Sequence, residues 1–143
     1  MESPYKYSST PTTLVKADPL QRFVAYFIDG LIGAVPIIIF ASLRMYSLIP
    51  IGQLVAVAYV LTKDALPEVS GYLGGQSIGK KIMNIKAVKE ATGESLLGDY
   101  GTAITRQVSL LIPIFNLVDM LMVFSDDRKR FGDKWAKTIV VKA

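Results

Sequence analysis

The stretch LQRFVAYFIDGLIGAVPIIIFASL, residues 20–43, decides the fold. At about 1.5 Å per helical residue, this apolar run is long enough to cross the roughly 30 Å hydrocarbon core of a bilayer. Asp18 is a suitable N-cap and Pro19 suits the first helical turn, so we expect a membrane helix that begins near Pro19. Two charges interrupt the run, Arg22 near its start and Asp29 in its interior.

Arg22 and Asp29 are about two helical turns apart, so they lie on nearly the same face of the helix. Arg22 can extend to the lipid headgroups, but an ionised Asp29 in hydrocarbon costs on the order of 3 kcal/mol. Asp29 must therefore face the protein interior, either as a structural pin between helices or as an ion or proton site. Gly30, Gly33 and Ala34 follow it, and small residues in this pattern favour the close packing of another helix.

The composition indicates a small integral membrane protein. Of 143 residues, 51% are apolar and only 20% are charged, which is unusual for a soluble domain. The chain has no cysteine and no histidine, so disulfides and a histidine metal site are excluded, and we expect no cofactor. The net charge of +4 fits basic loops against anionic lipid, and no basic–aromatic motif indicates nucleic-acid binding. Residues 1–18 are polar and predict a flexible cytoplasmic tail before one membrane domain, residues 19–143.

A second apolar segment, residues 46–61, contains Pro50 and Gln53. It is shorter than the first and is joined to it by a brief link that carries Arg44. Two apolar helices with so short a connection predict an antiparallel hairpin. We expect both helices to span the membrane.

The third apolar segment, residues 100–124, is broken in its middle by IPIFN. Lysine and arginine are concentrated on both sides of it, in residues 63–99 and in the C-terminal tail, and such basic segments prefer the cytoplasm. We therefore favour two half-length helices, 101–112 and 114–124, that form a re-entrant hairpin. The alternative is a third full crossing with an outside tail.

The basic segments contain three further patterns. GGQSIGKK, residues 74–81, nearly matches a phosphate-binding loop but lacks its final hydroxyl, so we interpret it as a flexible turn with two lysines at the lipid surface. DDRKRFGDKWAKT, residues 126–138, suits an interfacial helix with Phe131 and Trp135 on one face and Asp133 at its end or in solvent. IKAV and TIVV are typical of strands and would pair in a small cytoplasmic cap.

Arg106 and Asp119 lie in the two halves of the third segment. If that segment folds back, they can join Arg22 and Asp29 in an intramembrane network that balances two positive against two negative charges. No Ser/His/Asp set is possible in this chain, and no carboxylate pair has a spacing that demands hydrolase chemistry. The sequence therefore predicts that the protein is not an enzyme.

Four blocks in order resemble the RDD family of small membrane proteins: QRFVAYFIDGLI, GGQSIGKKIMNIKAV, RQVSLL and FGDKWAKTIVV. That family is named for one arginine and two aspartates. The resemblance implies that Arg22 and Asp29 are the first two of these residues. It maps the second aspartate to Asp133, with Asp119 as the competing assignment.

The expected fold is all-α and membrane-bound, with two transmembrane helices, a third broken segment and a small cytoplasmic cap that holds a short β pair. The resemblance implies two functions, which stay open. One is a cation/proton antiporter that moves Na⁺ or another monovalent cation through an Arg/Asp network. The other is a non-catalytic scaffold or accessory subunit of a membrane complex. In both cases we expect a multi-pass protein of the cell membrane, with a cytoplasmic N-terminus, that associates with itself or with a partner membrane protein.

Overall fold

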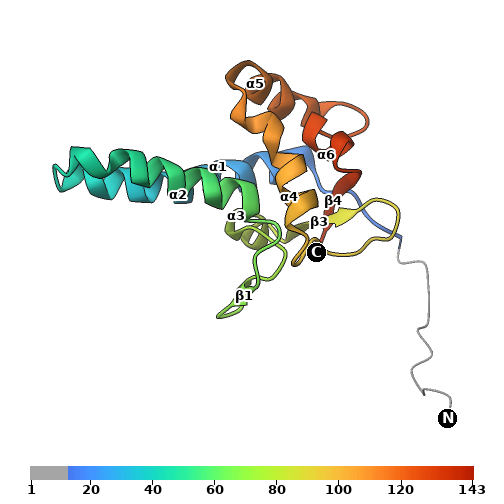
Figure 1. Ribbon diagram of the computed structural model, residues 1–143. Helices are drawn as coiled ribbons and strands as arrows, with labels where there is room; N and C mark the ends of the chain where they lie inside the picture. Colours follow the sequence, from blue (N-terminus) through green and yellow to red (C-terminus); the bar gives the residue numbers. More distant parts are fainter. Residues whose placement is uncertain (1–12) are drawn as a thin grey trace, which may run out of the picture.

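The computed structural model describes residues 13–143 and divides into an arm and a base (Figure 1). The arm consists of helix α1 (Pro19–Ser42) and helix α2 (Ile49–Thr62), which lie side by side and are linked through a 3-10 turn, η1 (Tyr46–Leu48). Within the described residues, α1 is the one single helix that is both long and apolar enough to cross a membrane. The α2 helix and its preceding turn, Tyr46–Thr62, form a shorter apolar helix.

The arm presents apolar side chains to its surroundings along its whole length. On α1, Phe27 and Leu31 are more than half exposed, and Leu54 on α2 is 70% exposed. Because α2 is apolar on all sides rather than on one stripe, it has the character of a helix that is surrounded by lipid or by other apolar helices.

The close approach of the two arm helices occurs at Gly52, which the sequence reasoning overlooked. A Cβ atom added there would lie 3.1 Å from the Phe40 ring and 3.3 Å from the backbone nitrogen of Ile37. The expected packing role of Gly30 is wrong within this chain, because a Cβ added at Gly30 would meet nothing within 4 Å. Gly33 faces the ring of Tyr59 more loosely. Ala34 lies with Gly30 and Gly33 along a groove between the arm and the third apolar segment.

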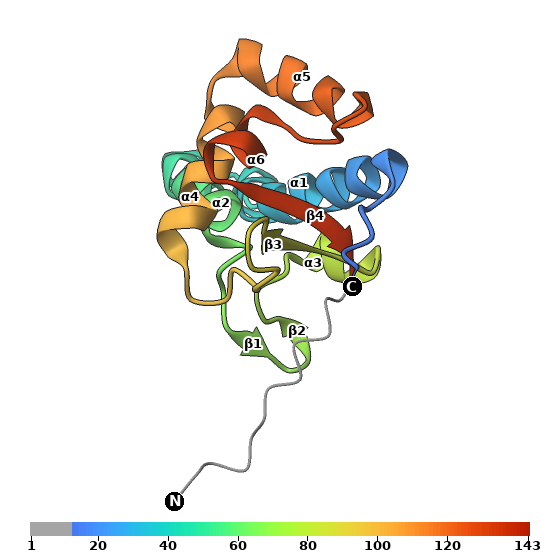
Figure 2. The same cartoon turned by 90° about the vertical axis from the view of Figure 1, so that its right-hand side faces the viewer.

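The base contains all the remaining elements. After α2 come a small hairpin, β1 (Glu68–Val69) and β2 (Tyr72–Leu73), then helix α3 (Ile78–Ile82) and strand β3 (Ile85–Lys89). Then follow α4 (Tyr100–Gln107), η2 (Val108–Leu111), α5 (Pro113–Leu121), η3 (Met122–Phe124), α6 (Phe131–Trp135) and β4 (Thr138–Lys142). Figure 2 looks along the arm and shows β3 and β4 crossing its base, with α5 on one side and the β1–β2 hairpin on the other.

Strands β3 and β4 pair antiparallel with Ala87 opposite Val140, and their inner side chains form the small apolar core of the base. Residues just before α1 extend this pairing. The backbone N–H of Ala17 donates to the carbonyl of Val140 at 3.0 Å, and Ala17 is fully buried. The predicted flexible tail is therefore too long at its C-terminal end, because residues 15–17 are bound to β4. Its first twelve residues lie outside the described part of the chain.

The third apolar segment is not a straight helix. Its halves, Tyr100–Leu111 and Pro113–Phe124, are related by a 107° bend. Ile112 adopts an extended conformation at the break, and Pro113 begins α5, because a residue before proline is disfavoured in the helical region. Asn116 holds the second half against the arm, where its side-chain oxygen accepts a 2.9 Å hydrogen bond from the hydroxyl of Tyr26.

The segments that precede β3 and β4 have the same local structure. Before β3, the short helix α3 contains Gly79 and is followed by Asn84, which has a positive φ of 55°. Before β4, the short helix α6 contains Gly132 and is followed by Lys137, which has a φ of 51°. Each glycine lies directly on the backbone of a longer helix. An added Cβ would fall 2.1 Å from the carbonyl oxygen of Ala25 at Gly79, and 1.8 Å from that of Arg106 at Gly132. Only glycine fits at either position.

Candidate functional site

A buried network of charged side chains lies at the base of the arm, where α1, α2, α3, α4 and α6 meet. None of its members is more than 8% exposed. It contains one more cation than carboxylates: Arg22, Lys63, Lys80, Arg106 and Arg130 against Asp29, Asp64, Asp119 and Asp133. Burial of charge is tolerated only with pairing and hydrogen bonds, so the partners of each carboxylate decide what the site can do.

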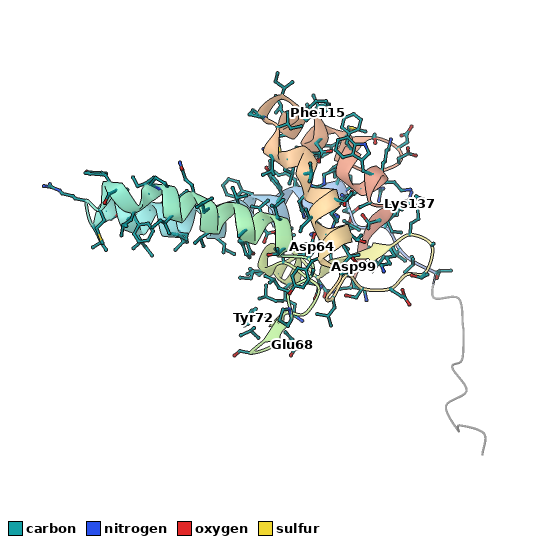
Figure 3. The ribbon with its side chains drawn as sticks, in the orientation of Figure 1. Asp64, Glu68, Tyr72, Asp99, Phe115 and Lys137 are labelled. Carbon is teal, nitrogen blue, oxygen red and sulfur yellow. The ribbon has the colours of Figure 1, made fainter. Side chains whose placement is uncertain are left out.

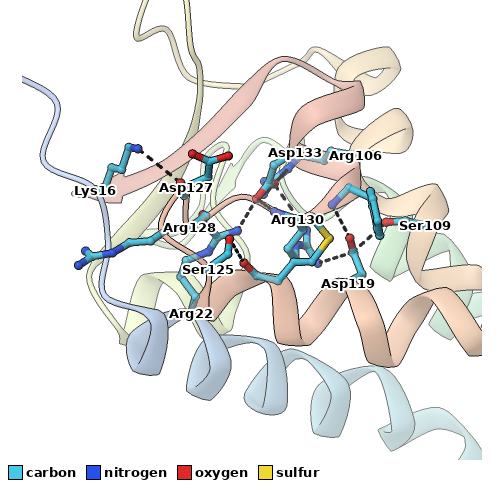
Figure 4. Close-up of polar contacts among 12 residues, drawn as sticks. Lys16, Arg22, Arg106, Ser109, Asp119, Ser125, Asp127, Arg128, Arg130 and Asp133 are labelled. Carbon is cyan, nitrogen blue, oxygen red and sulfur yellow. Dashed lines mark hydrogen bonds and ion pairs between the residues drawn. The ribbon is translucent and has the colours of Figure 1, made fainter.

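Asp133 joins three parts of the chain (Figure 4). Its carboxylate accepts bonds from Arg106 Nη2 at 2.6 Å and Nε at 3.2 Å, and it forms an ion pair with Arg22. It also accepts from the backbone N–H of Arg130 at 3.1 Å, at the start of α6. The sequence predicted that Asp133 lies either at a helix end or in solvent. Asp133 is in the first turn of α6, as one alternative required, but it is fully buried, so the solvated alternative is wrong.

Asp64 is the second carboxylate on Arg106, and it lies where α2 ends (Figure 3). It accepts from Arg106 Nη1 at 2.7 Å and from the amide of Gln107 at 2.9 Å, and it forms an ion pair with Lys80. Arg106 therefore bridges Asp64 and Asp133 with its planar fork of donors. The assignment of GGQSIGKK to a flexible turn at the lipid surface is wrong, because α3 forms there and Lys80 is buried against Asp64.

Asp29 has a partner that the sequence reasoning did not consider. One of its carboxylate oxygens accepts from Lys63 Nζ at 2.8 Å. The other accepts from the backbone N–H of Gly79 at 2.8 Å and from the hydroxyl of Tyr59 at 3.2 Å. Asp29 therefore does not pair directly with Arg22 or Arg106, the two arginines of the expected network, because both are bound to Asp133.

Asp119 belongs to the edge of the network and ties the bent third segment to α6. It accepts from the hydroxyl of Ser109 at 2.9 Å and from the backbone N–H of Phe131 at 2.6 Å (Figure 4). Its closest cation is Arg130, at 3.8 Å. Of the five predicted charged residues, Arg22, Arg106 and Asp133 are thus in direct contact, Asp119 joins them through Arg130, and Asp29 forms its own pair with Lys63.

Burial and pairing act against each other on the ionisation of this network. Burial by itself would raise the pKa of Asp133, but Arg106 and Arg22 outweigh burial and hold this pKa well below its usual range. In the same way, Lys80 and Arg106 overcome burial and lower the pKa of Asp64. Both carboxylates are therefore ionised at neutral pH. Burial lowers the pKa of Lys80 to about 7, because the attraction of Asp64 only partly compensates for it.

The charged side chains of the network line a small, partly open cavity. This cavity of about 40 Å³ is lined by the five cations and by Asp29, together with apolar side chains that include Phe23 and Leu110. A second, more open groove of about 300 Å³ runs beside it along the arm. Lys63 and Tyr26 line both spaces. In residues 13–143, no group of three or more acidic, histidine or cysteine side chains could hold a metal ion.

Four members of the network were missed by the sequence reasoning: Lys63, Asp64, Lys80 and Arg130. One signal was present for two of them, because Lys63 and Asp64 directly follow the second apolar segment. A charge pair at the end of a membrane helix is usually solvated at the headgroups, however, so this signal does not distinguish a buried pair from an exposed one.

A long apolar helix, a bent apolar helix pair and a buried charge network around the base of the arm define a small helical membrane protein. A family model matches residues 16–137, and the chain belongs to the RDD family. The resemblance that four sequence blocks indicated is thereby confirmed. No curated protein and no solved structure gives a significant match to this chain.

The geometry of Asp133 predicts a large loss of stability in Asp133→Asn. Removal of this carboxylate leaves Arg22 and Arg106 without their shared partner, and one unpaired buried charge costs about 3–5 kcal/mol. We expect a strongly lowered melting temperature and reduced folded yield in detergent. The matched control is Asp127→Asn, since Asp127 is 68% exposed and pairs only loosely with Lys134. Equal melting temperatures for the two variants would contradict the arrangement described for Asp133.

Proposed function

We propose that this protein is a non-catalytic scaffold or accessory subunit of a membrane complex, and that its buried charge network holds the fold rather than carrying cations. The observation that supports this most directly is the pairing of the carboxylates. Asp29, Asp64 and Asp133 each contact a protein cation within 3 Å, and the network as a whole has an excess of positive charge. Such an environment repels a passing Na⁺ ion.

The surroundings of Asp29 also disfavour the binding of a cation. Both of its carboxylate oxygens already accept bonds from Lys63, Gly79 or Tyr59. A cation could bind only by displacing the ammonium group of Lys63. That ammonium group is 4% exposed and would then be an uncompensated buried charge, at a cost of about 3–5 kcal/mol.

The length of the arm supports a specific depth for the network. Beyond Asp29, α1 continues only from Gly30 to Ser42, and α2 has 14 residues, or about 21 Å. The hydrocarbon core is roughly 30 Å thick. If both helices cross the membrane, Asp29 and Lys63 must lie about 10 Å inside the cytoplasmic boundary of the core. There the base of the protein encloses them, which explains why a carboxylate is tolerated in the first helix.

The distribution of basic residues supports a cytoplasmic base. At the tip of the arm there is one basic residue, Arg44, whereas the base carries exposed lysines such as Lys81 and Lys134. Because positive charge is retained in the cytoplasm, we place the tip outside and both α3–β3 and α6–β4 inside. The N-terminus is then cytoplasmic, and the bent α4–α5 pair enters and leaves from the cytoplasmic side of a multi-pass cell-membrane protein.

The apolar surface outside the network is the part of the molecule that is available for partners. On α5, Ile114 is 80% exposed and Leu117 60%, and Leu54 on α2 is 70% exposed. In a bilayer these side chains contact lipid tails or the helices of another membrane protein. We therefore expect the partner to be a membrane protein or a second copy of this chain.

Cation/proton exchange is the second candidate, and one observation favours it. Lys63 lines both the small cavity of the base and the more open groove along the arm. The Asp29–Lys63 pair thus lies between a space that reaches the membrane and a space inside the base. If Lys63 moved away, Asp29 would be accessible to a cation or a proton.

Flux measurements separate the two functions. The scaffold proposal predicts no Na⁺-dependent proton movement in proteoliposomes that contain the folded, inserted chain. The opposite finding would be proton movement that requires Na⁺, disappears in Asp29→Asn and persists in Asp127→Asn. That pattern would establish exchange and refute the scaffold proposal.

Cysteine labelling tests the proposed topology without background, since the chain has no cysteine of its own. Three exposed serines report on three positions: Ser42 near the tip, Ser95 after β3, and Ser125 after the third segment. An impermeant maleimide added to intact cells should label Ser42→Cys, and should label Ser95→Cys and Ser125→Cys only after permeabilisation. Labelling of Ser125→Cys from outside would show a third full crossing and exclude the re-entrant arrangement.

A further inference from the structure

The buried network is not electrically balanced. Its five cations face four carboxylates, and all nine side chains lie within the base. Three of the cations have a carboxylate partner at close range: Lys63 binds Asp29, Lys80 binds Asp64, and Arg22 binds Asp133. Arg106 shares Asp64 and Asp133 with them. These four cations therefore share three carboxylates, and the fourth carboxylate, Asp119, reaches the remaining cation, Arg130, only at 3.8 Å.

Arg130 is the cation with the weakest contacts in the network. Its guanidinium approaches the carboxylates of Asp119 and Asp133 only to 3.8 Å, and its one side-chain hydrogen bond, to Gln107, is 3.5 Å long. The ion pairs of Arg106, by comparison, are 2.6 and 2.7 Å. Since a guanidinium carries five N–H donors and Arg130 is only 8% exposed, this group has donors that no carboxylate of the described chain binds closely.

Arg130 also lines the small cavity of the base. The 40 Å³ cavity is lined by Arg130 and the four other cations, whereas Asp29 is the one carboxylate residue in its wall. A cavity needs about 10–15 Å³ to hold a water molecule, so this one has room for a small ion and a water. Phe23, Leu110 and Val123 are among the apolar side chains that also line it. Beside such side chains, electrostatic attraction is stronger than in water.

We propose that this cavity binds one small monovalent inorganic anion, such as chloride, between Arg130 and the other cations that line it. The anion balances the one excess positive charge of the network. It also accepts hydrogen bonds from the N–H groups of Arg130 that no carboxylate binds closely. The small volume favours a small anion, and a cation is repelled by the wall. The proposal goes beyond the scaffold function, because it holds whether or not the protein also has a partner.

The protonation of Lys80 makes the affinity for the anion depend on pH. Its ammonium group faces Asp64 at the end of α2, Arg106 on α4, Lys63 after α2 and Asp29 on α1. Burial, with smaller contributions from Arg106 and Lys63, lowers its pKa to about 7, and the attraction of Asp64 and Asp29 compensates only in part. A bound anion favours the charged form of Lys80. Anion binding is therefore accompanied by proton uptake near pH 7, and the affinity falls as the pH rises.

The test uses the full chain in an uncharged detergent, so that no lipid headgroup can occupy the cavity. Radioactive chloride is measured by equilibrium dialysis at constant ionic strength, with gluconate as the replacement anion because it is too large for the cavity. We expect saturable binding of one chloride per chain and a higher melting temperature in chloride than in gluconate. Binding should be roughly tenfold tighter at pH 6 than at pH 8, as expected for one linked proton.

Arg130→Gln should weaken chloride binding at least tenfold, whereas Lys134→Gln on the same short helix should leave it unchanged, because Lys134 is 43% exposed and lies outside the cavity wall. If wild type shows no saturable binding and equal melting temperatures in the two anions, the proposal is overturned, whatever the variants do. Unchanged affinity in a folded Arg130→Gln protein overturns it as well. Equal affinity at pH 6 and pH 8 overturns the role of Lys80.

Discussion

The cost of burying charge organises the base of this protein. Arg106 is completely buried, and it is bound by carboxylates from two other parts of the chain, Asp64 after α2 and Asp133 in α6. Through Asp133 it is also connected to Arg22, near the start of α1. Because none of these charges can remain unpaired in the interior, α1, α2, α4 and α6 must meet at this point. A small apolar core, formed mainly by β3, β4 and Ala17, accompanies the network but does not connect these helices.

Two glycines make this meeting possible. Gly79 and Gly132 place the backbones of α3 and α6 directly on α1 and α4, at positions where any Cβ would collide with a carbonyl oxygen. The close approach of α3 also brings the N–H of Gly79 to Asp29. In both halves a left-handed residue, Asn84 or Lys137, then turns the chain into the paired strands. The two halves of the protein thus use the same local structure to attach a strand to a longer helix.

The sequence was sufficient for the parts that depend on local pattern. The long apolar stretch with Arg22 and Asp29 predicted α1, and the IPIFN break indicated that the third segment is bent, as Pro113 imposes. The partner of Asp29 was not predictable in this way. Lys63 lies far from Asp29 in sequence, and a lysine after a membrane helix normally reaches the headgroups. Its burial depends on its contacts with Asp29 and Tyr26 of α1, which only the three-dimensional arrangement determines. The same holds for Lys80, whose near match to a phosphate-binding loop was a coincidence of composition.

The central claim is that the charges of the base stabilise one another as pairs. A double-mutant cycle on Asp29 and Lys63 tests it most directly, with the free energy of unfolding measured in mixed detergent micelles for Asp29→Asn, Lys63→Met and the double variant. Each single change leaves one buried charge unpaired and should cost about 3–5 kcal/mol. The double variant removes both charges and should be destabilised by much less than the sum of the two. Additive losses would show that the two residues do not act as a pair and would contradict this account of the fold.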